Sequence, residues 1–89
     1  MNDLNQKSIL ITGATSGIGR ALTIKLLKSG AFVSFCGKSD EKMKSLCKEI
    51  DSYNISNENY NYTSFDITDE SKIVKFVSDA EQKFGKIDV

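Results

Sequence analysis

The residues with the clearest chemical potential are three glycines within residues 12–19, where the chain reads Thr-Gly-Ala-Thr-Ser-Gly-Ile-Gly. An apolar run at residues 8–12 precedes them, and apolar residues at helical spacing follow them. A turn that leads from a strand into a helix presents unpaired backbone N–H groups at the positive end of the helix dipole. Because such a turn binds phosphate, these residues predict an anion site.

Each residue type in this turn has an expected role. Gly13 permits the sharp turn, Gly17 leaves space for a diphosphate, and Gly19 lets the helix pack closely against the strands. The hydroxyls of Thr15 and Ser16 can donate further hydrogen bonds. A glycine cluster by itself is more often a flexible turn, but here a strand pattern precedes it and a helix pattern follows. The spacing GxxxGxG differs both from GxGxxG and from the nucleoside triphosphate loop GxxxxGK[ST].

Alternating strand and helix patterns must position this turn. The pattern predicts strands at residues 8–12, 31–36 and 62–65, helices at 17–29, 40–53 and 69–84, a loop at 54–61 and the start of a fourth strand at 87–89. Ser39 and Thr68 are the expected caps of the second and third helices. In the third helix, the residues expected to face inward are Ile73, Phe76, Val77, Ala80 and Phe84. This alternation predicts an α/β fold with a parallel sheet.

Composition excludes several classes of protein. The 89 residues allow one small domain at most, which makes stability in isolation marginal. Twelve basic residues balance 12 acidic residues, so no broad positive field is available to bind nucleic acid. Two cysteines without any histidine argue against a disulfide scaffold and a zinc site. Without a signal-peptide pattern or a long apolar run, we expect no membrane association and a cytoplasmic location.

The glycine turn, as residues 12–19, resembles the cofactor loop of the short-chain dehydrogenase/reductase family. Four landmarks appear in the family's order: residues 7–13, Gly-Lys at 37–38, Asp-Ile-Thr at 66–68 and Gly-Lys-Ile-Asp-Val at 85–89. The resemblance implies a Rossmann-type, doubly wound parallel sheet with strand order 3-2-1-4. Residues 1–89 would be the N-terminal part of one such domain, with β-α-β-α-β-α and the start of a fourth strand.

The resemblance also implies a cofactor site. The backbone of Ile18 and its neighbours would hold the pyrophosphate, and Asp66 and Ile67 would flank the adenine. For Asp66, the simpler alternative is a loop carboxylate that forms a turn. The complete set of expected cofactor-binding residues is Thr12, Gly13, Thr15, Ser16, Gly17, Ile18, Gly19, Lys38, Asp66 and Ile67.

The end of the second strand favours NADP(H) over NAD(H). Gly37 stands where a carboxylate would accept the ribose 2′-hydroxyl of NAD, and Lys38 would neutralise the 2′-phosphate of NADP. NAD(H) stays possible if Lys38 is only a solvated lysine and Asp40 or Glu41 turns toward the ribose. Relatives that prefer NADP often carry a basic residue where this chain has Ser16.

The family's catalytic serine and Tyr-x-x-x-Lys pair are not expected in this chain. Tyr53, Tyr60 and Tyr62 are not followed by lysine four positions later. We therefore expect the N-terminal third of an NADP(H)-dependent oxidoreductase of roughly 250 residues, inactive alone and acting on an undetermined carbonyl or alcohol. The alternative is a non-catalytic dinucleotide-binding or interaction module. The resemblance implies homo-oligomers for a full-length relative, and the isolated chain is expected to self-associate through the apolar edge at residues 9–11.

Overall fold

The computed structural model describes residues 5–89, which form three strands and three α-helices. In chain order, the elements are β1 (Ser8–Ile11), α1 (Gly17–Lys28), β2 (Phe32–Gly37), α2 (Asp40–Ser52), the 3-10 helix η1 (Asn57–Asn59), β3 (Tyr60–Ser64) and α3 (Glu70–Phe84). Ser16 and Ser39 cap α1 and α2, because each side chain accepts a hydrogen bond from the backbone three residues later.

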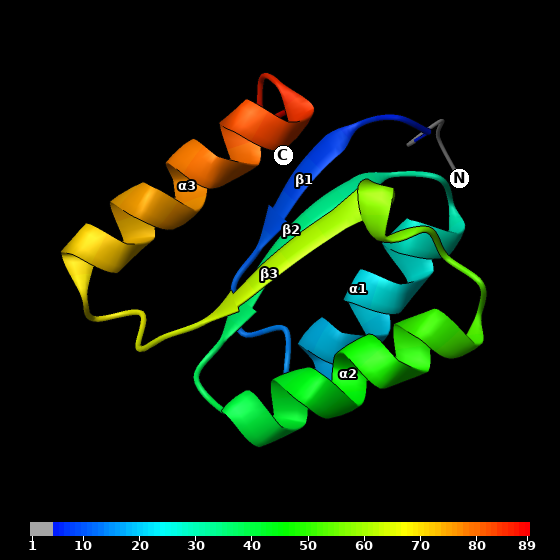
Figure 1. The fold of residues 1–89 in the computed structure, drawn as a ribbon, viewed down its shortest axis with the longest axis horizontal. Coiled ribbons are helices and arrows are strands. Elements are labelled where there is room, and N and C mark those ends of the chain that lie inside the picture. The colour runs from blue at the N-terminus through cyan, green and yellow to red at the C-terminus, as the bar shows by residue number, and fades with distance from the viewer. Residues whose placement is uncertain (1–4) are drawn as a thin grey trace.

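The three strands form a parallel sheet in the order β1-β2-β3. Figure 1 shows α1 and α2 on one side of this sheet and α3 on the other. The predicted α/β class and parallel strand pairing are therefore confirmed. Because parallel strands point the same way, the turns after β1, β2 and β3 lie at one end of the sheet.

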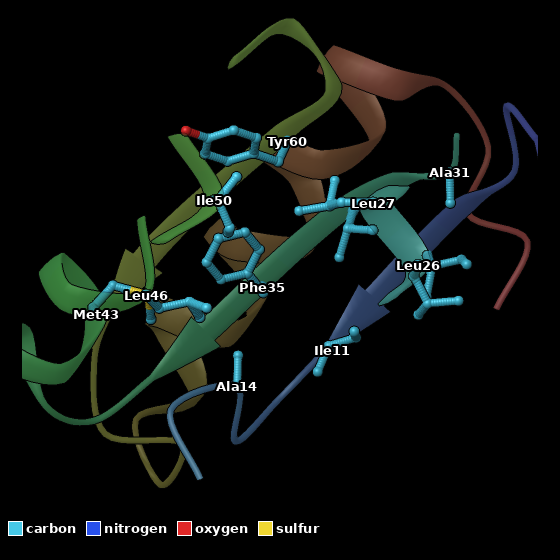
Figure 2. Packing of buried hydrophobic residues seen from close by; sticks show 12 residues of the cluster. Ile11, Ala14, Leu26, Leu27, Ala31, Phe35, Met43, Leu46, Ile50 and Tyr60 are labelled. Atoms are coloured by element: carbon cyan, nitrogen blue, oxygen red, sulfur yellow. The ribbon is translucent and has the colours of Figure 1, made fainter. Parts of the chain in front are cut away.

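The apolar residues form two clusters, one on each face of the sheet. The larger cluster packs β1 and β2 against α1 and α2, and Figure 2 shows Phe35 of β2 among Leu27, Leu46 and Ile50. The smaller cluster, beneath α3, contains Cys36, Phe65 and Phe76 with Leu10 and Ile73 packed against it. Alternate residues of a strand point to opposite faces, which explains why Phe35 and Cys36 belong to different clusters.

The free side of β1 is partly covered by the last two residues. Leu10 N–H donates to Val89 O (3.0 Å), and Val89 N–H donates to Ser8 O (3.2 Å). These are the two bonds of a parallel pair in which Val89 lies opposite Ile9. The Asp88 carboxylate also accepts a hydrogen bond from Ser8 N–H (2.9 Å). The expected fourth-strand position beside β1 is thus occupied, although residues 87–89 do not form a regular strand.

The structure corrects two local predictions. β3 begins at Tyr60 rather than Tyr62, because Tyr60 is buried against Phe35 with ring centroids 5.8 Å apart. The cap of α3 is Asp69 rather than Thr68: the Asp69 carboxylate accepts from the backbone N–H of Lys72.

No helix within residues 5–89 is both long enough and apolar enough to cross a membrane.

Candidate functional site

The glycine turn joins β1 to α1 and is anchored to the end of β2. Gly13 has φ +67°, a left-handed conformation that favours glycine. Ala14 N–H donates to Cys36 O (3.0 Å), which fixes the turn against β2. A Cβ at Gly19 would collide with the carbonyl oxygen of Gly13, so α1 can start this close to the turn only with glycine there.

The hydroxyl of Ser16 is used inside the turn. It donates to Gly13 O (2.9 Å) and accepts from Gly19 N–H (3.3 Å), so it stabilises the start of α1. Within residues 5–89, the backbone N–H groups of Gly17 and Ile18 have no hydrogen-bond partner. Gly17 is exposed, a Cβ there would meet nothing within 4 Å, and Ile18 is 87% exposed. These two open donors are what an anion at this helix end would bind.

A small pocket lies where the turn meets the ends of β2 and β3. Its volume is about 140 Å³, and its lining is Gly13, Cys36, Gly37, Lys38, Phe65, Asp66 and Ile67. The structure therefore brings together four of the predicted residues, namely Gly13, Lys38, Asp66 and Ile67. A larger hollow of about 640 Å³ lies beside η1 and the start of β3, at the other end of that strand from the glycine turn.

The other predicted residues do not line this pocket. Thr12, Ser16, Gly17 and Ile18 form the exposed part of the turn. The methyl and hydroxyl of Thr15 lie 2.7 and 2.9 Å from the place where a Cβ of residue 37 would be. Gly37 is therefore needed for Thr15 to pack on the end of β2.

Cys36 and Phe65 line the pocket but were not predicted as site residues. Each directly precedes a predicted landmark, Gly37 or Asp66, and strand direction could have indicated them. Both residues are apolar, which is typical of the hydrophobic core, and both belong to the smaller cluster. Burial raises the pKa of the Cys36 thiol, while a hydrogen bond with the Gly13 backbone lowers it less. A protonated thiol makes Cys36 part of the pocket wall rather than a nucleophile.

Asp66 and Lys38 contact each other at the pocket. The carboxylate and ammonium are 3.9 Å apart, and their side chains are 51% and 82% exposed. Asp66 Oδ1 also accepts from the backbone N–H (3.0 Å) and the hydroxyl (2.9 Å) of Thr68. The Thr68 hydrogen bonds, and to a smaller extent the charge of Lys38, lower the pKa of Asp66. Asp66 therefore forms a turn, as the simpler sequence alternative predicted, while it also lines the pocket.

An open parallel sheet, with helices on both faces and a glycine turn after its first strand, defines a Rossmann-like α/β protein. The chain belongs to the short-chain dehydrogenase family, since the family model described as short chain dehydrogenase matches residues 7–89.

Known relatives agree with this family. The chain is 40% identical over 87 residues to short chain aldehyde dehydrogenase 1 of Euphorbia lathyris, covering 97% of this chain and 28% of that protein. The glucose dehydrogenase of Caenorhabditis elegans in its apo form superimposes with a TM-score of 0.91 at 30% identity, over 98% of this chain and 37% of that one. The 3-ketoacyl-(acyl-carrier-protein) reductase of Brucella melitensis, solved with NADH, gives 0.79 at 30% identity, over 96% and 33%.

The chain is short compared with these proteins. It spans 25–36% of the length of the curated relatives compared with it. The comparisons therefore place residues 7–89 in the family and describe oxidoreductases that are about three times longer.

Proposed function

We propose that residues 1–89 form the N-terminal part of one NAD(P)-binding Rossmann domain and build the adenosine side of an NADP(H) site in a short-chain oxidoreductase. The observation that carries this proposal is the pocket shared by the glycine turn, Lys38, Asp66 and Ile67 at the carboxyl end of the sheet. Ligands of doubly wound sheets bind at that end of the strands.

The chain's geometry fits a dinucleotide. The open N–H groups of Gly17 and Ile18 would hold the diphosphate, and the space above Gly17 lets it approach the backbone. Ile67, which is 48% exposed, offers an apolar surface for the adenine beside Asp66. When bound, the nicotinamide cofactor supplies the hydride chemistry of the family's reactions.

NADP(H) is the preferred cofactor because of the side chains at the end of β2. Gly37 cannot accept a hydrogen bond from a ribose 2′-hydroxyl through a side chain, whereas Lys38 presents an exposed ammonium in the pocket lining. Asp40 and Glu41 lie in the first turn of α2, where their charges complement the helix dipole. An NADH complex of a relative keeps NAD(H) as the competing cofactor.

The reaction belongs to the longer protein. No tyrosine of this chain is followed by lysine four residues later, so carbonyl or alcohol hydride transfer would need groups outside residues 1–89. We expect the 89 residues alone to bind cofactor weakly and to be inactive. A cytoplasmic location and homo-oligomer formation by the longer protein are further expectations; both Cys36 and Cys47 are free thiols, as a reducing compartment would keep them.

Titration of the chain with NADPH and with NADH tests the proposal. We expect tighter binding of NADPH, and Lys38→Met should weaken NADPH binding about tenfold while leaving NADH nearly unchanged. Lys44→Met, at an exposed position of α2, is the matched control and should change neither affinity.

Two results would contradict the proposal. Absence of binding to either cofactor would remove the dinucleotide site, and equal weakening of both by Lys38→Met would remove the assignment to the 2′-phosphate. A monomeric, cooperatively folding chain with micromolar NADPH affinity would instead favour the alternative of a self-sufficient, non-catalytic module.

A further inference from the structure

The register of β2 and β3 places Lys38 and Asp66 next to each other. Gly37 pairs with Ser64, and Phe65 N–H donates to Gly37 O (3.0 Å). The residues that directly follow these bonded positions are Lys38 and Asp66, and their charged groups are 3.9 Å apart. Their proximity is therefore a consequence of strand pairing.

The two partners differ in freedom. Two hydrogen bonds from Thr68 fix Oδ1 of Asp66 and leave Oδ2 directed to Lys38. The same hydrogen bonds keep the pKa of Asp66 below its usual value, so the carboxylate is charged at neutral pH. The side chain of Lys38 is 82% exposed and flexible, so its ammonium is the partner that can move.

We propose that Asp66 determines how strongly the site discriminates NADP(H) from NAD(H), because it competes with the 2′-phosphate for the Lys38 ammonium. This inference rests on the proposed function, since it requires Lys38 to face that phosphate. An exposed ion pair of this length is weak, so Asp66 reduces the preference for NADP(H) without abolishing it. The site would thus still prefer NADP(H), but less strongly than Lys38 without Asp66 would make it.

Asp66→Asn tests the competition. The amide oxygen of asparagine can still accept the Thr68 hydrogen bonds, while the negative charge is lost. We expect the ratio of NADPH affinity to NADH affinity to rise roughly threefold, the scale of an exposed ion pair. The ratio cancels any contact of residue 66 with the adenine that both cofactors share. Asp69→Asn is the matched control, because it removes one nearby carboxylate, keeps a good helix cap and should leave the ratio unchanged.

The same substitution in a Lys38→Met background separates competition from direct repulsion. Without the ammonium, Asp66→Asn should no longer change the ratio; a ratio that still rises threefold would mean that Asp66 repels the phosphate directly, and the proposal would be overturned. An unchanged ratio in Asp66→Asn alone, in a chain that binds both cofactors, overturns it as well.

Two further measurements keep the outcomes distinct. Circular dichroism reports whether each variant is folded, and Asp66→Ser supplies a second neutral side chain with an acceptor oxygen if Asp66→Asn unfolds. A parent chain that binds neither cofactor refutes the proposed function itself, which is a different result from a parent that binds both and a variant whose ratio does not move.

Discussion

Gly17 and Gly19 lie two residues apart in one turn, yet a methyl group added to each would meet different surroundings. A Cβ at Gly17 has nothing within 4 Å, whereas a Cβ at Gly19 would collide with the backbone carbonyl of Gly13. A backbone oxygen held in a turn cannot move aside as a flexible side chain can. The two glycines therefore serve ligand access and folding, respectively.

Alanine at each position separates these roles. We expect Gly17→Ala to change the free energy of unfolding by less than about 1 kcal/mol, because the site is open, but to weaken NADPH binding about tenfold. Gly19→Ala should lower the free energy of unfolding by about 1–3 kcal/mol, as overpacking does. Urea unfolding followed by circular dichroism, together with NADPH titration, measures both effects. Equal destabilisation by the two substitutions would contradict this assignment.

Tyr60 gives the fold a predictable alkaline limit. Its side chain is buried and its hydroxyl donates to Asp51 Oδ1 (3.2 Å). Burial, and then the hydrogen bond and charge of Asp51, raise the pKa of Tyr60 from 10 to about 12. The folded chain thus holds this proton more tightly than the unfolded chain does. Its contribution to stability is complete below pH 10 and is lost as the pH rises from 10 to 12.

Urea unfolding at several pH values from 7 to 11.5 measures this contribution. The parent should lose on the order of 2 kcal/mol of unfolding free energy across the alkaline range through Tyr60. Tyr60→Phe should remove that part of the decrease, although it also loses the hydrogen bond to Asp51 at neutral pH. The idea is wrong if the variant shows the same alkaline decrease as the parent.

At the scale of elements, hydrophobic periodicity predicts features that depend on residues close together in the sequence, such as the buried face of a helix. Met43, Leu46 and Ile50 recur on one face of α2 and are buried, as expected for an amphipathic helix. The first helix shows the limit of this reasoning. Ile18 and Leu22 continue its apolar spacing but are 87% and 46% exposed, while Thr23 is fully buried. Spacing cannot tell which side of a helix the sheet will cover.

The start of β3 and the contact between Lys38 and Asp66 depend on partners distant in sequence. Tyr60 follows polar residues, a pattern that predicts a loop, but its ring packs on Phe35 of β2. Similarly, the meeting of the two charged residues follows from the pairing of Gly37 with Ser64. Register between strands is set by tertiary packing, so single-residue patterns did not reveal either feature.

The cap of α3 offers a test at this scale. Thr68 and Asp69 both suit a helix N-cap, but only Asp69 accepts from Lys72 N–H, and the Thr68 hydroxyl is used by Asp66. We expect Asp69→Ala to lower the thermal midpoint by about 5 °C, whereas Asp69→Asn, which retains a capping oxygen, should lower it less. Circular dichroism measures the thermal midpoint of each variant. If Thr68→Ala lowers the midpoint more than Asp69→Ala does, Thr68 is the cap, as the sequence predicts.

At the scale of the whole molecule, the edges of the small sheet determine whether the chain self-associates. Among residues 5–89, β1 is paired on its outer side only with residues 88–89, and apolar Ile18, Leu22 and Val89 are exposed. Open strand edges pair with other chains, so we expect the 89 residues to self-associate as their concentration rises. The partial pairing by residues 88–89 should reduce this tendency without eliminating it.

Asp88→Ala should increase self-association, because the carboxylate that accepts from Ser8 N–H helps to hold residues 88–89 beside β1. Sedimentation velocity at a series of concentrations measures the effect. Asp79→Ala makes the same change of charge on α3, where it removes only an exposed ion pair with Lys75, and should behave like the parent. If the parent and Asp88→Ala are both monomeric at every concentration, the outer edge of β1 does not mediate self-association.

The distance in sequence between Ser8 and Asp88 also has a consequence for synthesis. On one side, β1 pairs with β2, whose residues lie about two dozen positions later in the sequence. On the other side, Ser8 of β1 bonds Asp88, which lies 80 positions later. At translation rates of about 5–20 residues per second, a ribosome needs about 4–16 s to add that stretch. During this interval the nascent chain exposes one edge of its first strand, and an exposed strand edge is where a chain pairs with other chains.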